Sequence, residues 1–260
     1  MLRVTDLALS YGATPVLEGV SMEVEEGEFV SLVGPSGSGK STILRAVIGL
    51  QAPSAGQVEL AIDKQKVGFL FQDDALLPWR RAAENVALGL KLRGMPKHDA
   101  MKLANEWLGR LGLEGLGGRY PRELSGGQRK RVALAQVLAL EPQLLLMDEP
   151  FSALDAITRA RLSQDLIRLV EERHMSVLLV THDLEEALAL SDNVYLLSRG
   201  PKARIAGQYP VPIPRPRDII KARTHPDFGP LLERIWQNLS REVVGEPGKG
   251  DPWAGFSIGL

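Results

Sequence analysis

The chain has 260 residues, 44% of them hydrophobic and 24% charged, with a formal net charge of −1 and no cysteine. These values fit one large α/β domain with a small appendage. The net charge excludes a positive field over the whole chain that would attract nucleic acid or an anionic membrane. The absence of cysteine excludes disulfides, thiol catalysis and cysteine-ligated metals. The N-terminus does not read as a signal peptide, and no apolar run reaches the ~20 residues that cross a bilayer. We therefore expect any membrane role to come through a partner.

The first 33 residues predict β-structure. Residues 21–25 alternate polar and apolar side chains, as a half-buried antiparallel strand does. Residues 29–33 are almost wholly apolar, which is typical of a strand buried on both faces. A helix is expected to follow over residues 40–49.

The middle of the chain predicts a helical insert followed by alternating helices and strands. Short strands near Val58 and over residues 67–71 precede the insert, which covers residues 82–113. The alternation beyond the insert favours a parallel sheet with helices on both faces. In that part we expect helices over 125–140 and 155–173 and strands over 144–147 and 177–180.

The last part of the chain has a different character. Prolines at every second position from Pro210 to Pro216 exclude a central strand or a helix there. A helix is expected over residues 228–243, and the Gly/Pro-rich end from Gly245 is expected to be a loosely held tail. We therefore predict one domain over residues 1–209 and a C-terminal extension over 210–260.

A phosphate-binding loop lies between the buried strand and the helix that follows it. Residues Gly34–Ser41 match G-x-x-x-x-G-K-S, in which glycines let backbone N–H groups wrap around phosphate oxygens. Lys40 adds positive charge towards the β- and γ-phosphates, and the Ser41 hydroxyl suits Mg²⁺. The alternative, a plain Gly/Ser turn, is disfavoured by the strand–loop–helix context. The predicted contacts are Gly34, Pro35, Ser36, Gly37, Ser38, Gly39, Lys40, Ser41 and Thr42.

Two carboxylates follow the apolar strand that ends at Met147. Adjacent residues at a strand end point in different directions, so Asp148 and Glu149 address different partners. Asp148 suits the Mg²⁺ side, and Glu149 suits a general base that polarises an attacking water. A solvated strand end is the alternative when the pair is taken alone, but the phosphate loop in the same chain favours the functional interpretation.

The segment Leu124–Gln128 predicts a second anion site. Ser125 is a good N-cap, and the two glycines that follow expose backbone N–H groups at a helix start. Taken alone, the segment is only a capped helix. A chance occurrence of both this segment and the phosphate loop in one chain is improbable.

With these motifs, residues 1–210 resemble the nucleotide-binding subunit of ATP-binding cassette (ABC) transporters. The resemblance implies an α/β fold: a P-loop NTPase core with a mostly parallel sheet, an N-terminal antiparallel β subdomain and a helical subdomain over about residues 82–140. It also implies ATP and Mg²⁺ as cofactors and ATP hydrolysis as the activity.

The resemblance assigns further roles residue by residue. Tyr11 matches the aromatic residue that stacks on adenine, although a lone tyrosine is more often surface or core. Gln72 matches the glutamine that touches Mg²⁺ and the attacking water, and His182 matches the histidine that senses the γ-phosphate. The loop Ser152–Asp155 matches the one that couples two ATP sites. The expected catalytic set is Lys40, Gln72, Glu149 and His182, and the expected metal set is Ser41, Gln72 and Asp148.

The resemblance also implies partners. In a head-to-tail dimer, the phosphate loop of one chain and Ser125, Gly127 and Gln128 of a second copy would sandwich each ATP. Closure of the dimer would drive transmembrane permease subunits, with a periplasmic or extracellular solute-binding protein acting indirectly and no nucleic acid involved. The chain is then expected at the cytoplasmic face of the cell membrane.

Two positions depart from the family pattern. Lys130 and Gln136 stand on the helix behind Leu124–Gln128, where related sequences often carry glutamine and arginine respectively. We expect the change to affect local salt bridges rather than chemistry. The segment 60–66 is also short for the family, which is expected to trim the antiparallel part.

The sequence of the strip Leu76–Arg80 is similar to the segment at the same place in the ATPases of importers of nitrate, sulfonate, taurine and pyrimidine-type vitamin precursors. It is interpreted as a docking strip for a permease, with packing of the helical insert as the alternative. An exporter or a lipid or lipoprotein-trafficking ATPase is the alternative function, because the cassette itself does not fix the direction of transport. A chromosome-type ATPase is excluded by the gap of only about 83 residues between Ser41 and Ser125. The basic residues Arg215, Arg217, Lys221 and Arg223 are expected to form a solvated face, with contact to lipid or permease as the alternative.

Overall fold

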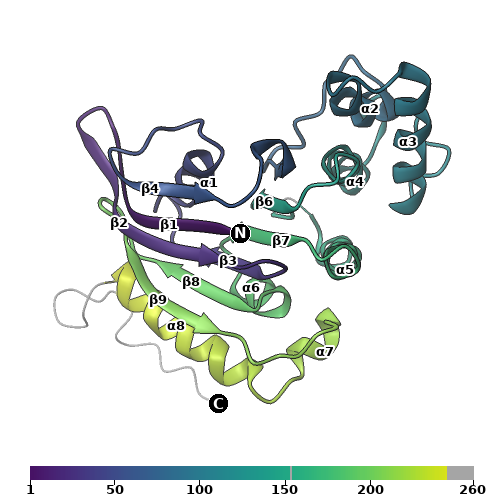
Figure 1. Ribbon diagram of the computed structural model, residues 1–260. Helices are drawn as coiled ribbons and strands as arrows, with labels where there is room; N and C mark the ends of the chain where they lie inside the picture. The colour runs from purple at the N-terminus through teal and green to yellow at the C-terminus, as the bar shows by residue number, and fades with distance from the viewer. Residues whose placement is uncertain (153, 245–260) are drawn as a thin grey trace.

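The computed structural model describes residues 1–152 and 154–244, and a six-stranded sheet runs through its centre (Figure 1). Its strands are β5 (Val67–Leu70), β6 (Leu144–Asp148), β7 (Ser176–Thr181), β3 (Phe29–Val33), β8 (Asn193–Leu197) and β9 (Ile205–Pro210), in this spatial order. All are parallel except β9, which runs antiparallel to β8. Every residue of β3, β6 and β7 is buried, because helices and a second sheet cover both faces. The expected mostly parallel sheet is confirmed.

A three-stranded antiparallel sheet covers one face of the central sheet. It consists of β1 (Leu2–Tyr11), β2 (Thr14–Val24) and β4 (Ala55–Leu60), with β1 in the middle. Its inward residues form one hydrophobic cluster with Ile43 and Leu44 of helix α1 (Lys40–Val47) and with Val30 and Leu32 of β3. This packing places α1 between the two sheets, and it confirms the antiparallel β part.

A helical subdomain lies at one end of the molecule, at the upper right of Figure 1. The expected helical insert consists of two helices, because Gly94 takes a φ of 88° and Pro96 has no N–H to continue a helix. A third helix begins immediately after Ser125, as predicted. The helices are α2 (Ala82–Leu92), α3 (Lys97–Arg110) and α4 (Gly126–Leu138).

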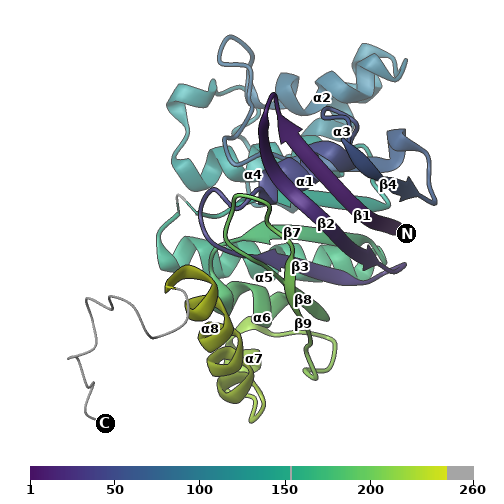
Figure 2. The same ribbon diagram turned by 90° about the vertical axis from the view of Figure 1, so that its left-hand side faces the viewer.

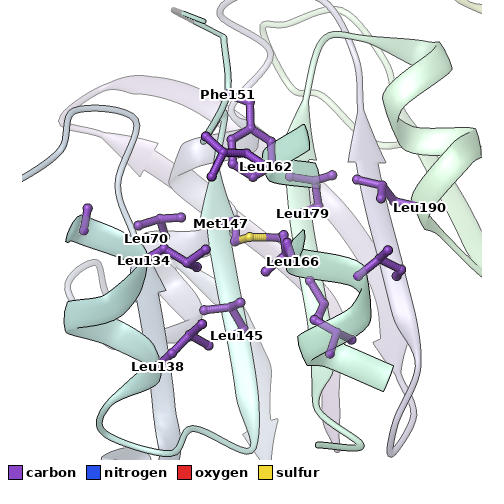
Figure 3. Packing of buried hydrophobic residues seen from close by; sticks show 14 of the residues in the cluster. Leu70, Leu134, Leu138, Leu145, Met147, Phe151, Leu162, Leu166, Leu179 and Leu190 are labelled. Atoms are coloured by element: carbon purple, nitrogen blue, oxygen red, sulfur yellow. The ribbon is translucent and has the colours of Figure 1, made fainter. Parts of the chain in front are cut away.

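The second hydrophobic cluster lies on the other face of the central sheet. Figure 3 shows Leu134 and Leu138 of α4 and Leu166 of α5 (Ala156–Glu172) packed against Leu145 and Met147 of β6. Each fully buried leucine or methionine stabilises the fold by about 1.5–3 kcal/mol. This packing fixes β6, and with it the two carboxylates at its end.

The C-terminal extension packs on the same cluster. Helices α6 (Leu184–Leu190), α7 (Ile219–Arg223) and α8 (Phe228–Val244) lie together (Figures 1 and 2). The Asn238 amide of α8 donates to the Tyr209 hydroxyl of β9. The expected helix over 228–243 is therefore present, whereas the expected tail from Gly245 lies outside the described residues. The domain boundary at residue 210 stays a prediction. No helix in the described residues is long and apolar enough to cross a membrane.

One expectation about this extension is wrong. The basic residues from Arg215 to Arg223 do not all form a solvated face, because Arg217 is only 4% exposed. Its guanidinium donates to Asp192 and to the backbone oxygens of Leu190 and Ile213. Arg215 also pairs with Asp192. Asp192, just before β8, thus pairs with both arginines, so they fasten the Pro-rich segment to the domain.

Candidate nucleotide-binding site

The candidate site lies at the carboxyl ends of four neighbouring parallel strands. The phosphate loop follows β3, the acidic pair ends β6, His182 follows β7, and Gln72 follows β5. Open α/β sheets bind ligands at this edge. The sheet order therefore gathers residues that lie far apart in the sequence.

The phosphate loop is shaped by its backbone and by β2. Gly39 takes a φ of 98° at the start of α1, and a Cβ there would lie 2.8 and 2.9 Å from side-chain atoms of Leu17 and Val16. Only glycine fits this conformation and this space. The loop thus turns directly into the N-terminus of α1, whose free N–H groups suit phosphate oxygens.

Lys40 and Ser38 fit a phosphate ligand. The Lys40 ammonium lies across the loop and donates to the Gly34 and Pro35 carbonyl oxygens at 2.9 Å each. Burial lowers the pKa of Lys40, and the nearby carboxylates of Glu149 and Asp148 oppose that change. The Ser38 hydroxyl is buried without a hydrogen-bond partner in the described residues. A phosphate group would supply the partner that this hydroxyl lacks.

The predicted metal ligands Ser41 and Asp148 are adjacent. The Ser41 hydroxyl donates to Oδ1 of Asp148 at 2.9 Å. Burial raises the pKa of Asp148, and the hydrogen bond from Ser41 opposes that rise. A hydroxyl and a carboxylate are hard oxygen ligands of the kind that Mg²⁺ binds next to phosphates. The donor set therefore fits Mg²⁺.

Glu149 and His182 face each other across the ends of β6 and β7. The Glu149 N–H donates to the Val180 carbonyl at 2.8 Å, which carries the strand pairing one residue past β6. Its φ of 43° then turns the chain, a strained conformation for a residue with a side chain. Nδ1 of His182 lies 2.9 Å from Oε2 of Glu149. The carboxylate is thus held by the histidine, and it lies near enough to Lys40 for its charge to act on the pKa of that ammonium.

Tyr11 and Gln72 lie at the rim of the site. Tyr11 ends β1 with 45% of its surface exposed, and a hydrogen bond with Thr42 lowers the pKa of its phenol. This position beside α1 leaves its ring free to cover a base. Gln72 is exposed, and its backbone oxygen accepts from Lys130. No hydrogen bond in the described residues joins the Gln72 side chain to Ser41 or Asp148.

The segment Leu124–Gln128 does not join the phosphate loop of its own chain. The Gln128 N–H donates to the Ser125 hydroxyl at 3.3 Å, and the Gln128 amide oxygen accepts from the Ser125 N–H at 2.9 Å. Gly127 packs closely on α5, since a Cβ there would lie 2.7 Å from a Thr158 methyl group. Figure 1 shows α4 on the far side of β6 from α1. Ser125 and Gly126 are exposed, so this helix start is open to a second molecule.

The loop after Glu149 is tied to the site by a residue that the motifs did not indicate. Arg159 donates to the Leu154 carbonyl at 3.1 Å and to Oδ2 of Asp183, next to His182, at 3.0 Å. Ala153 of the predicted coupling loop lies outside the described residues. The only sequence signal for Arg159 is an arginine one turn after the N-cap Asp155.

Known proteins are similar to this chain over most of its length. A family model described as ABC transporter matches residues 17–152. The aliphatic sulfonates import ATP-binding protein SsuB 2 of Mesorhizobium japonicum is 45% identical over 245 residues, which cover 94% of this chain and 93% of that protein. The bicarbonate transport ATP-binding protein CmpC of Synechococcus elongatus is 40% identical over 235 residues, 87% of this chain. The match spans 35% of the length of CmpC.

A solved structure has the same fold. The ATP-binding cassette MJ0796, in a dimeric post-hydrolysis state bound to ADP and Pi, matches with a TM-score of 0.72 and 33% sequence identity. The match covers 81% of this chain and 99% of that one.

Proposed function

Since this chain belongs to the ABC transporter family, we propose that it is the ATP-hydrolysing subunit of an importer for a small anionic solute. One observation carries the proposal: the sheet order brings Lys40, the Ser41–Asp148 pair and the Glu149–His182 pair to one edge. These are the groups that phosphoryl transfer from ATP to water requires.

The binding step is assigned to the phosphate loop and α1. Backbone N–H groups of the loop and the Lys40 ammonium hold the phosphates, and the Ser38 hydroxyl gains its missing partner there. Tyr11 covers the adenine. Mg²⁺, bound by Ser41 and Asp148 with Gln72 at the rim, supplies charge neutralisation for the β- and γ-phosphates.

The hydrolysis step is assigned to Glu149 and His182. Glu149 accepts a proton from the water whose oxygen attacks the γ-phosphorus, and the bond from that phosphorus to the β-phosphate oxygen breaks, giving ADP and phosphate. The contact at 2.9 Å from His182 orients the Glu149 carboxylate for this task. A rigidly held base needs no reorganisation when the water arrives.

A second copy of the chain completes each site in this proposal. The exposed helix start at Ser125 offers N–H groups and a hydroxyl to an anion, but it lies away from its own phosphate loop. A head-to-tail dimer would place Ser125, Gly127 and Gln128 of one chain over the ATP of the other. The dimeric state of the similar cassette MJ0796 supports this proposal.

The strip Leu76–Arg80 is assigned to the permease. Trp79 is 71% exposed, so it is free to enter an interface. The buried amide of Asn85 binds the N–H and carbonyl of Leu77 and the carbonyl of Arg80, which holds the strip in one shape. An exposed tryptophan on a fixed backbone is a favourable interface anchor.

The solute class and the direction of transport come from the similar proteins. SsuB 2 is named for import of sulfonates and CmpC for transport of bicarbonate, both anions. Nitrate and taurine-like solutes fall within this class, and a vitamin precursor is the alternative solute. A separate solute-binding protein would deliver the solute, and the chain would act at the cytoplasmic face of the membrane through its permease. Export or lipid trafficking is the alternative.

The proposal is tested first on the purified chain. Wild type should hydrolyse ATP only with Mg²⁺, and Lys40→Ala should weaken ATP binding at least about tenfold, because a buried charged contact to phosphate is lost. Equal ATP affinity in wild type and Lys40→Ala would contradict the phosphate-loop assignment. Transport is then tested by co-purifying the permease and measuring ATP-driven uptake of labelled sulfonate or bicarbonate into vesicles. Extrusion instead of uptake would favour the export alternative.

A further inference from the structure

Three consecutive basic residues on α4 pair with carboxylates on two other segments of the chain. Arg129 reaches Asp74 in the segment after β5, with Nε 3.0 Å from Oδ2, and also donates to the Leu124 carbonyl at 2.8 Å. Lys130 binds the same carboxylate, with Nζ 3.2 Å from Oδ1. Arg131 turns instead to Asp165 of α5 at 3.0 Å. Asp74 is thus held by two cations from the helix that begins at Ser125.

Lys130 also binds the backbone at Gln72, the residue predicted to contact Mg²⁺ and the attacking water. Its ammonium donates to the carbonyl oxygens of Phe71 and Gln72 as well as pairing with Asp74. Lys130 is 5% exposed, and the side chain of Asp74 is 20% exposed. An ammonium with three oxygen partners in such a place is held in one geometry. We call this arrangement the Lys130 clamp, meaning Lys130, Asp74, and the carbonyl groups of Phe71 and Gln72.

The clamp joins two parts of the chain that serve different ATP molecules in the proposed dimer. Gln72 serves the ATP held by its own chain, whereas Ser125 contacts the ATP held by the partner. Lys130 lies five residues beyond Ser125, about 7 Å along α4. A helix is stiff over that distance, so a displacement at Ser125 moves the Lys130 ammonium.

We propose that the Lys130 clamp couples the two ATP sites of the dimer: Lys130 acts as a positioning residue that transmits ATP contact at Ser125 to Gln72 of the same chain. This inference rests on the proposed function. When the partner's ATP draws Ser125 into place, the clamp sets the backbone at Gln72, so each site works best when the other is filled. Lys130, one of the two positions that depart from the family pattern, thereby gains a role in the reaction.

The first measurement is the dependence of ATP hydrolysis on ATP concentration in the full-length chain. Wild type should give a Hill coefficient close to two, the limit for two coupled sites. Lys130→Met keeps the length of the side chain but removes its charge, and it should lower the coefficient to about one. Asp74→Asn should do the same, and Lys130→Arg should restore a value near that of wild type. The matched control is Lys102→Met, an exposed lysine on α3, which should behave as wild type.

A second measurement separates coupling from general loosening. Hydrogen–deuterium exchange over residues 71–76 should become at least about tenfold faster in Lys130→Met, while exchange in β6 and β7 stays as in wild type. The double variant Asp74→Asn/Lys130→Met should lose less than the sum of the two single variants, because both changes break the Lys130–Asp74 contact. If the loss of coupling in the double variant equals the sum of the two single losses, the proposed role of the clamp is overturned.

The outcomes distinguish this inference from the function on which it rests. If wild type hydrolyses no ATP, the proposed function fails. If wild type is active but shows a Hill coefficient of one, or if Lys130→Met keeps the wild-type coefficient, the coupling is overturned and the proposed function stands. If Lys130→Met does not fold, Asp74→Asn and Lys130→Arg decide the result by the same criteria.

Discussion

Nδ1 of His182 lies 2.9 Å from Oε2 of Glu149, although 33 positions separate the two residues. The contact follows from the sheet, because Asp148 at the end of β6 pairs with Val180 near the end of β7. The positive φ of Glu149 directs its carboxylate to the histidine. The backbone conformation of Glu149 therefore helps to position the carboxylate that is proposed as the general base.

Glu149→Gln should abolish steady ATP hydrolysis and preserve ATP binding. An amide has the size of the carboxylate but does not accept a proton, and loss of a general base costs about 10²–10⁴-fold in rate. Because the phosphate loop is intact, the variant should accumulate as an ATP-bound dimer. Turnover assays and molar mass by light scattering, with and without ATP, check both statements. Turnover near the wild-type rate would contradict the assignment of Glu149.

His182→Ala should lower the turnover rate more than it changes ATP affinity. The variant leaves Glu149 in place but removes the group that holds its carboxylate, so we expect a loss of about 10–100-fold, smaller than that for loss of the base itself. The matched control is His225→Ala, whose imidazole lies 3.5 Å from Asp227 outside the site. Equal effects of the two substitutions would remove the special role of His182.

The Mg²⁺ concentration that the chain needs for activity should depend on pH through the protonation of Asp148. Burial raises the pKa of Asp148, so on lowering the pH this carboxylate takes up its proton earlier than an ordinary aspartate does. The protonated form binds Mg²⁺ poorly, so the Mg²⁺ concentration for half-maximal activity should rise as the pH falls. Asp148→Asn serves as the control, because it shares the titration of ATP but lacks the carboxyl group. If the Mg²⁺ concentration for half-maximal activity rises equally with falling pH in wild type and in Asp148→Asn, this role of Asp148 is contradicted.

The mostly parallel sheet, the phosphate loop and the acidic strand end could be predicted because each depends on local pattern. A buried apolar strand followed by a glycine-rich loop has few other structures available, and parallel strands align their carboxyl ends. The division of the helical insert into two helices was not predicted, although Gly94 and Pro96 are local turn signals.

The contacts that join distant segments could not be predicted. Lys130 was expected to affect only local salt bridges, yet it binds Asp74 and the carbonyl of Gln72, more than fifty positions away. Arg217 was placed in a solvated cluster, because nothing near it in the sequence shows that Asp192 lies beside it in the fold. In both cases a buried charge is paired with a partner that only tertiary structure brings close.

Trp79→Ala should weaken assembly with the permease and leave the ATPase activity of the isolated chain unchanged. Trp79 is exposed and is held outside the nucleotide site by the strip that Asn85 fixes. Loss of an aromatic anchor costs about 2 kcal/mol or more of binding free energy at a typical interface. The control is Trp236→Ala, a second exposed tryptophan, on α8. Pull-down of the permease should decline for Trp79→Ala alone, and equal recovery of both variants would contradict the docking strip.

Glu186→Gln should raise the thermal stability of the chain at neutral pH. Glu186 is 8% exposed; its Oε2 accepts from the Thr181 hydroxyl at 2.7 Å, and its Oε1 has no partner in the described residues. Burial raises the pKa of this carboxyl group in the folded state. The folded state therefore holds the proton more tightly than the unfolded state, and stability falls as the pH rises from the unfolded pKa through the folded pKa.

Above the folded pKa of Glu186, the buried ionised carboxylate lowers the free energy of unfolding by a constant amount. The neutral amide of the variant removes this loss and still accepts a hydrogen bond from Thr181. Each ~1 kcal/mol recovered corresponds to about 2–4 °C in Tm for a chain of this size. Melting curves of wild type and Glu186→Gln should therefore differ at about pH 7.5 and converge near pH 4, where the wild-type carboxyl group is protonated. A Tm difference that is the same at both pH values would show that ionisation of Glu186 is not its origin.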